Sequence, residues 1–229
     1  MMKKNLIITG GIFHPFSETS DTLSKILNTL GYDSEITLDL EKGIKDINNF
    51  DLITFNALRW RMLNHEKYIP YLDEWQFSLS VSSRNILDSY LKNGGAMIAF
   101  HTSSICFDDW DGWSKLLGGK WNWDKSFHPP LGMVEVSPIK NHFLNNNLDK
   151  FEIEDEVYHN LHLEPESKPF LLAKTKETNE EHIVGWSYKY EDGKVVYNAL
   201  GHDAKSLLQP EMVEIIKKSV EWVSGENNA

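Results

Sequence analysis

The sequence predicts one α/β domain with a mainly parallel central sheet and a β-rich final third. In the first 100 residues, short apolar segments alternate with amphipathic helical segments, and in the final third strand patterns follow one another without long helices between them. A length of 229 residues and a hydrophobic fraction of 41% suffice for one large core. We therefore expect a single domain over residues 1–229.

The first half follows a strand–turn–helix order. A helix between the first two strands places Leu23, Ile26 and Leu27 on one face and ends at Gly31. Such units form right-handed crossovers between parallel strands. The predicted strands of this half are Asn5–Thr9, Ser34–Leu38, Asp51–Asn56 and Ala96–Phe100.

The segment Gly94–His101 is the most informative of these strands. A Gly-Gly pair is followed by five apolar residues and then by His101 and three small polar residues, which predicts a buried strand ending in a polar turn. In open α/β sheets ligands bind at the carboxyl ends of the strands. His101 is therefore placed where chemistry is usually done.

Two further regions complete the predicted fold. The segment Ala57–Val81 is long and rich in aromatic side chains. It suits either a lid over a binding site or an aromatic cap on the sheet edge. The final third predicts strands at Phe170–Thr175, Ile183–Tyr190 and Lys194–Leu200, with a hairpin turn between the last two. A closing amphipathic helix begins at Pro210.

Composition limits the partners and the compartment. The 23 basic and 34 acidic residues give a net charge of −11, which repels nucleic acid and acidic membrane surfaces. A single cysteine excludes an internal disulfide, and neither a signal core nor a membrane-spanning apolar run is evident. We expect a soluble cytoplasmic protein whose partner is a small molecule.

Histidines are the main candidates for chemistry. Five of the nine follow a predicted strand or lie in a loop between elements, and Glu156 and Asp203 are close to two of them in sequence; the five are His14, His101, His128, His159 and His202. Imidazole and carboxylate groups serve both as general acids or bases and as ligands of divalent metals, so both roles stay open. The candidate metal ligands are His14, His101, His128, Glu156 and His202. The other four histidines are interpreted as surface or structural residues.

Other catalytic motifs are weak. Cys106 lies five residues after His101 and precedes Phe107, which favours a small buried residue over a nucleophile. The chain has no G-x-S-x-G, Walker A, G-x-G-x-x-G or H-E-x-x-H motif. Serine hydrolase, P-loop, dinucleotide-binding and zincin interpretations therefore lack support.

A tryptophan-rich stretch accompanies the histidines. Trp110, Trp113, Trp121, Trp123 and Phe127 fall within 18 residues, next to several aspartates. Aromatic faces and carboxylates suit a sugar ring, and a tryptophan-rich core patch explains the same residues equally well. We name Trp110 and Trp113 as candidate contacts for substrate, together with His14, His128 and His159.

These features together resemble a known family. The matching segments are Gly10-Gly11 with His14, Gly94-Gly95-x5-His101, Trp110–Gly119, His128-Pro129, Asp155-Glu156-x-Tyr158-His159, and Trp186 to Gly193-Lys194-Val195-Val196-Tyr197 running on to Leu200-Gly201-His202-Asp203. They resemble the ThuA-like (trehalose utilisation) family of the class I glutamine amidotransferase-like superfamily. The resemblance covers nearly the whole chain.

The resemblance implies a flavodoxin-like three-layer sandwich and a role in the metabolism of disaccharides such as trehalose or of keto-sugars. It places His14, His101, His128, Glu156, His159, His202 and Asp203 at the polar positions of the family. The chain departs from amidotransferases because His101 stands where they need a nucleophilic cysteine, so glutamine hydrolysis is disfavoured. Within the family, Phe13 stands where a second histidine is found.

Two functions stay open from the sequence. The first is an enzyme, an isomerase or a hydrolase, in which His101, Glu156, His202 and Asp203 perform acid–base chemistry on a sugar, with or without a divalent metal. The alternative is a non-catalytic carbohydrate-binding or regulatory module on a scaffold that has lost its nucleophile. Assembly into a homo-oligomer is compatible with both.

Overall fold

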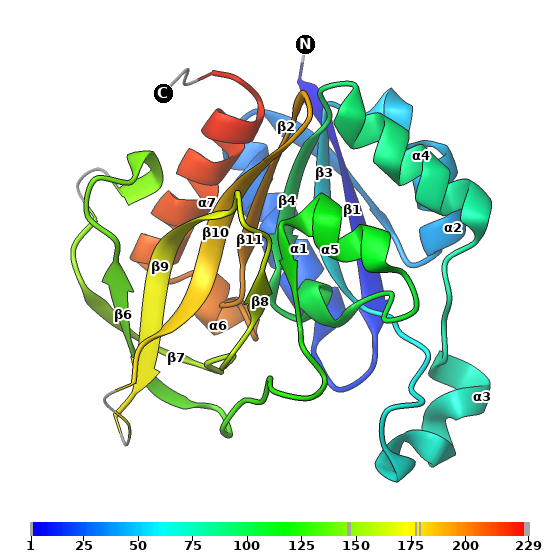
Figure 1. Cartoon of the computed structure of the whole chain (residues 1–229). Helices are drawn as coiled ribbons and strands as arrows, with labels where there is room; N and C mark the ends of the chain where they lie inside the picture. Colours follow the sequence, from blue (N-terminus) through cyan, green and yellow to red (C-terminus); the bar gives the residue numbers. More distant parts are fainter. Residues whose placement is uncertain (1, 146–147, 177, 179, 227–229) are drawn as a thin grey trace.

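A twisted sheet of nine strands runs through the described part of the chain, which in this computed structural model is residues 2–145, 148–176, 178 and 180–226. The strand order is β2-β1-β3-β4-β11-β10-β9-β6-β7 (Figure 1). The strands are β1 (Lys3–Gly11), β2 (Tyr32–Thr37), β3 (Leu52–Leu58), β4 (Ala96–Phe100), β6 (Gly132–Pro138), β7 (Phe151–Asp155), β9 (Lys168–Thr175), β10 (His182–Tyr190) and β11 (Gly193–Asn198). A separate antiparallel pair joins β5 (Gly119–Lys120) and β8 (His162–Leu163).

Helices cover both faces of the parallel half of this sheet. The α-helices are α1 (Phe16–Thr29), α2 (Leu40–Lys45), α3 (Leu72–Trp75), α4 (Val81–Lys92), α5 (Asp111–Leu117), α6 (Ala204–Leu207) and α7 (Pro210–Val223). The short 3-10 turns are η1 (Ile47–Asn49), η2 (Glu66–Tyr71), η3 (His101–Ile105) and η4 (Phe143–Asn145).

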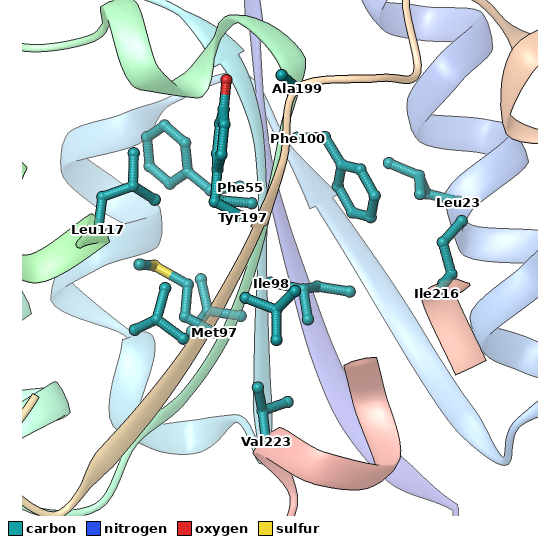
Figure 2. Packing of buried hydrophobic residues seen from close by; sticks show 14 of the residues in the cluster. Leu23, Phe55, Met97, Ile98, Phe100, Leu117, Tyr197, Ala199, Ile216 and Val223 are labelled. Carbon is teal, nitrogen blue, oxygen red and sulfur yellow. The ribbon is translucent and has the colours of Figure 1, made fainter. Parts of the chain in front are cut away.

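The two helical layers are visible in the packing around β4. Figure 2 shows Phe100 turned toward Leu23 of α1 and Ile216 of α7, while Met97 lies on the opposite side, where Leu117 of α5 packs. All five residues of β4 and all seven of β3 are buried, as expected for strands covered on both faces. Complete burial of each large apolar side chain contributes about 1.5–3 kcal/mol.

The sheet has a parallel part and an antiparallel part. Strands β2, β1, β3, β4 and β11 are parallel, and β10, β9, β6 and β7 continue the sheet in antiparallel pairs. The antiparallel part is larger than the sequence predicts for a mainly parallel sheet. Because four antiparallel steps lead from β11 to β7, and β11 is parallel to β4, β7 runs in the same direction as β4. The carboxyl ends of β1, β4, β7 and β11 therefore meet at one edge.

The predicted elements of the first half and the β-rich final third are confirmed, with shifted bounds. Helix α4 begins at Val81, because the Ser80 hydroxyl accepts a hydrogen bond from the Ser83 backbone N–H at 3.2 Å. The predicted hairpin pairs Tyr190 with Gly193. Pro210 occupies the first turn of α7, where its missing N–H costs nothing.

The aromatic segment after β3 divides into two parts. Trp60 and Met62 are buried with Phe16 and Leu58 in a small second core, which matches the expectation of an aromatic cap. Beyond them, η2 and α3 extend away from the sheet (Figure 1). Among the described helices, none combines the length and apolar character that crossing a bilayer requires.

Glu41 of α2 holds the start of α4. Its carboxylate accepts hydrogen bonds from the Ser80 backbone N–H at 2.7 Å and from the hydroxyls of Ser80 and Ser83. Partial burial alone would raise the pKa of Glu41, but these hydrogen bonds outweigh it and lower the pKa. The carboxylate thus stabilises the fold when it is ionised.

We predict that Glu41→Ala lowers the free energy of unfolding by about 1 kcal/mol at pH 7, a modest value because the site is partly solvated. Since the folded pKa is lowered, the contribution is present above the unfolded pKa and is lost as the pH falls through the folded value. Urea unfolding at pH 7 and pH 3 should show the difference between wild type and variant shrinking. Glu35→Ala, at an exposed position of β2, is the matched control.

Candidate functional site

Four polar side chains meet at the carboxyl edge of the sheet. His14 lies in the loop after β1, His101 directly follows β4, Glu156 directly follows β7, and His202 lies between β11 and α6. One ligand atom from each lies within 4.8 Å of the corresponding atom of every other. We call these four residues the histidine–glutamate cluster.

Glu156 is the centre of the cluster. Its Oε2 atom lies 3.8 Å from His14 Nε2, 3.5 Å from His101 Nε2 and 3.6 Å from His202 Nδ1. A fourth imidazole nitrogen, His128 Nδ1, is 3.5 Å from the same oxygen. A single carboxylate oxygen therefore faces four histidines.

The imidazole of His101 has a fixed orientation. Its Nδ1 lies 2.6 Å from the carbonyl oxygen of Ala199, and since a carbonyl only accepts, Nδ1–H is the donor. In the neutral ring, Nε2 then carries a lone pair that points into the cluster. Tyr158 supports this arrangement, because its hydroxyl lies 3.3 Å from His101 Nε2.

The separations around Glu156 are longer than ordinary hydrogen bonds. Charged N–H···O contacts usually measure about 2.7–2.9 Å, whereas these measure 3.5–3.8 Å. Glu156 Oε2 and both ring nitrogens of His14 are buried and have no hydrogen-bond partner. Buried polar atoms without partners are costly, so this group of atoms has the geometry of a ligand shell around a further atom.

A divalent cation fits this ligand set. Bonds of about 2.0–2.1 Å in a tetrahedral zinc site place neighbouring ligand atoms roughly 3.3 Å apart. The separation of 3.4 Å between His101 Nε2 and His202 Nδ1 matches that edge, as do the distances from Glu156. Three imidazoles and one carboxylate are a donor set typical of zinc and related metals.

Charge inside the cluster is balanced by its members. Burial would by itself raise the pKa of Glu156, but His101, His14 and His202 outweigh it and hold the pKa of Glu156 far below its usual range. The Glu156 carboxylate raises the pKa of His202, and burial lowers the pKa of His14. The carboxylate is thus ionised and His14 is neutral at pH 7, as metal ligands need to be.

Asp155 ties the cluster to the rest of the fold. This completely buried carboxylate accepts hydrogen bonds from the backbone N–H of Glu156 and of Gly201, both at 2.8 Å, and from the hydroxyl of Ser206. Burial raises its pKa. One side chain therefore fixes the position of Glu156 relative to the turn that carries His202.

The predicted residues separate into two groups. The structure brings together His14, His101, Glu156 and His202, with His128 at the more exposed border, where 40% of its side chain is accessible. His159 lies outside this group, since its ring stacks on His182 at 3.7 Å between centroids and packs against Phe127. His182, which we interpreted as surface or structural, is buried.

Asp203 and the tryptophans have structural contacts. Asp203 caps α6 by accepting a hydrogen bond from the Ser206 N–H at 2.8 Å. Trp113 is completely buried and donates from Nε1 to the Ser103 carbonyl at 2.8 Å. Trp110 and Trp113 nevertheless border a cavity of about 300 Å³ that is also lined by Trp121, Trp123, Asp108, Asp124 and neighbouring residues.

Two aromatic residues near the cluster, Tyr158 and Trp121, were not predicted as site residues. Tyr158 packs its ring against His101, and Trp121 packs edge-on against Tyr158 and approaches His128, which joins the cavity to the cluster. Tyr158 and Asp155 both flank Glu156 in the sequence. Their closeness to Glu156 in the sequence is the feature that could have indicated a role in the site, but the strand-like pattern of this segment does not show which side chains face the cluster.

Cys106 is a buried thiol with structural contacts. It is 2% exposed, donates to the Ala57 carbonyl at 3.2 Å and accepts from the Arg59 N–H at 3.3 Å. Burial raises the pKa of the Cys106 thiol to about 12. This supports a structural residue over a nucleophile, because the thiolate is the reactive form.

We predict that iodoacetamide at pH 8 leaves Cys106 unmodified in the folded protein and alkylates it completely in urea. Mass spectrometry of both samples measures the difference. Stoichiometric labelling of the folded protein within minutes would contradict the assignment.

We predict that Asp155→Asn lowers the free energy of unfolding by about 1–3 kcal/mol, because an amide NH₂ would face backbone donors at a buried site. Urea unfolding measures this change. Glu154→Gln, at the neighbouring position with a more exposed ion pair to Lys205, should cost less than about 1 kcal/mol. Equal stability of the two variants would sink the proposed role of Asp155.

Solved structures with the same fold include a ThuA-like protein from Parabacteroides merdae, with a TM-score of 0.79 and 15% identity over 99% of this chain and 91% of that one. A ThuA-like protein from Bacteroides uniformis gives a TM-score of 0.72 and 16% identity over 96% and 91% of the two chains. A cytoplasmic protein from Salmonella typhimurium LT2 gives a TM-score of 0.65 and 12% identity over 97% of each of the two chains. No curated protein matches the chain significantly.

The profile of one protein family matches almost the whole chain. It is described as "Trehalose utilisation" and covers residues 4–223, which include every member of the histidine–glutamate cluster. This match and the resemblance found in the sequence agree, and family membership suggests a role in carbohydrate metabolism. The chain belongs to the ThuA family.

Proposed function

We propose that the protein is an enzyme of carbohydrate metabolism that acts on a disaccharide or keto-sugar at the histidine–glutamate cluster, with a divalent metal bound there. The observation that carries this proposal is the set of buried nitrogen and oxygen atoms around Glu156 Oε2, which are too far apart for hydrogen bonds and correctly spaced as metal ligands. The family description supports the sugar as substrate class.

The residues of the site have distinct proposed roles. His14, His101, His202 and Glu156 hold the metal, which when bound would polarise a carbonyl oxygen or lower the pKa of a water molecule. His128 is the best placed group to move a proton, because it borders the cluster and is the most exposed of its histidines. Tyr158 orients His101, and Asp203 positions the His202 turn by capping α6.

The adjoining cavity is the proposed site for a sugar ring. Three tryptophans and three residues with side-chain oxygen atoms are among its lining: Trp110, Trp121, Trp123, Asp108, Asn122 and Asp124. Its volume of about 300 Å³ is at the lower end of ligand pockets. The rings of Trp121 and Tyr158 connect this cavity with the cluster, because Trp121 packs against Tyr158 and Tyr158 packs against His101.

The expectations about the fold class, the location and the partners of the protein remain proposals. The parallel strand order β2-β1-β3-β4-β11 is that of flavodoxin-like sheets, which supports this description of the core. A cytoplasmic location is supported by the name of the Salmonella protein of similar fold. Homo-oligomerisation and the absence of nucleic-acid or membrane partners rest on sequence composition alone.

We expect protein purified without chelator to contain about one equivalent of a divalent transition metal per chain by elemental analysis. His101→Ala and Glu156→Gln should each reduce metal affinity by at least about tenfold, since both remove a ligand. His65→Ala, at an exposed position in the aromatic segment, should retain the wild-type content. A metal-free wild type whose thermal stability does not respond to added zinc or manganese would refute the metal proposal.

Turnover separates the enzyme from the non-catalytic module. We expect conversion of trehalose or an oxidised derivative of it to be lost in His128→Ala and in metal-stripped protein, while sugar binding, measured by calorimetry, is retained. Binding without turnover in the metal-loaded wild type, across neutral and oxidised disaccharides, would favour the module. The readout is product formation by chromatography.

A further inference from the structure

Arg59 differs from the other arginines of the chain. The sequence contains three, and two have carboxylate partners: Arg61 with Asp108 at 3.4 Å and Arg84 with Asp109 at 2.6 Å. Among the described residues, no carboxylate oxygen lies within the 4.0 Å of an ion pair from Arg59. Burial lowers the pKa of Arg59, and the charge of the exposed residue Glu74, which makes no direct ion pair with it, offsets this only in part.

Arg59 is also partly buried and firmly held. Its backbone N–H donates to Cys106 Sγ at 3.3 Å, and its carbonyl accepts from the Phe107 N–H at 2.9 Å. The guanidinium carbon lies 4.9 Å from the centre of the Trp75 ring. Its Nε atom is buried and has no hydrogen-bond partner. Burying a charged donor without an acceptor is costly, so the site favours an added oxyanion.

The place of Arg59 in the fold is that of a ligand-binding group. It directly follows β3, and its Nη2 atom lies 3.9 Å from where a Cβ on Gly10 would project at the end of β1. From β1 the chain continues to β2 on one side of the sheet and then returns to β3 on the other side of β1. The strand order therefore reverses between β1 and β3. In open α/β sheets this switch point forms the binding crevice.

Gly10 lets the backbone at the end of β1 pass close to the side chains of Leu38 and Arg59. Its φ is +109°, which a residue with a side chain rarely adopts, and a Cβ there would approach Leu38 to 3.0 Å. Four residues later the same loop carries His14 of the histidine–glutamate cluster. One loop thus connects the surroundings of Arg59 with the cluster.

The geometry points to an oxyanion-binding site at Arg59, formed by its guanidinium over the glycine end of β1, which holds a carboxylate or phosphate group of the ligand. Guanidinium binds both groups through paired N–H donors, so the shared chemistry is a planar or tetrahedral oxyanion. This inference rests on the proposed function, because the ligand that carries the anion is the sugar turned over at the cluster. Among the disaccharides and keto-sugars of the proposed function, the preferred substrates are then those that carry a carboxylate or phosphate group.

The three arginines allow a direct test in the wild-type protein. With ¹⁵N-labelled arginine, the Nε–Hε spectrum should contain three side-chain signals, and Arg59→Lys assigns one of them by its disappearance. Inorganic phosphate, glucuronate and glucose are titrated separately. We expect phosphate or glucuronate to shift the Arg59 signal saturably while the signals of Arg61 and Arg84 stay in place, and we expect glucose to leave all three unchanged.

The outcomes separate the two sources of the anion. A shift with phosphate alone identifies a phosphate ester, and a shift with glucuronate alone identifies a carboxylate. An unmoved Arg59 signal with both anions overturns the inference, as does an equal, unsaturated movement of all three signals. In calorimetry, Arg59→Gln should weaken the effective anion at least about tenfold, whereas Arg84→Gln, which removes the same charge, should not.

Failure of this inference is distinct from failure of the proposed function. In Glu156→Gln, the anion titration of Arg59 should match that of the wild type, because the two sites use different residues. If the wild type binds no metal and turns over no sugar while Arg59 binds its anion, only the proposed function fails. If metal binding and turnover of neutral sugars persist in Arg59→Lys and no anion shifts Arg59, only this inference fails.

Discussion

The arrangement of the site depends on the buried carboxylate of Asp155. In the strand order, β7 lies five positions from β4, and in a flat sheet with strands about 4.8 Å apart their ends would be roughly 24 Å apart. Asp155 instead accepts hydrogen bonds from Gly201 and Ser206, which follow β11. The antiparallel half must therefore curl back toward the parallel half, and this curl carries Glu156 to His101. Sheet twist makes such a curl accessible, and the three hydrogen bonds of Asp155 select it.

This coupling explains how the fold tolerates so many polar atoms without partners at one point. The elements that carry His101, His202 and Glu156 are held by contacts away from the cluster: Asp155 for Glu156, the Ala199 carbonyl for His101, and the α6 cap for the His202 turn. The ligand atoms are consequently held in place before any ligand is present. Preorganisation of this kind lowers the entropic cost of binding a metal or a transition state.

The sequence predicts the local parts of this structure and misses the non-local ones. The strand before His101, the helix stop at Gly31 and the hairpin at Gly193 follow from short-range patterns that the structure confirms. Four of the candidate metal ligands meet in space because each follows a strand that ends at the same edge. The stacking of His159 on His182 could not be predicted, since strand starts and strand ends at one edge look alike in sequence. The unpaired state of Arg59 was equally hidden, because pairing depends on which aspartates fold nearby.

The turn at His101 has a strained backbone that orients the imidazole ring. His101 has a φ of +45°, a conformation that costs free energy for a residue with a side chain and that persists where the surroundings enforce it. Tyr197 contributes by donating to the His101 carbonyl at 2.6 Å and to Ser104 at 2.8 Å. A strained turn after a buried strand points one side chain into the site. With imidazole at that position, the Ala199 contact fixes the ring and aims Nε2 at Glu156. The strain is thus compatible with ligand positioning, whereas Cys106 is buried and hydrogen-bonded away from the cluster.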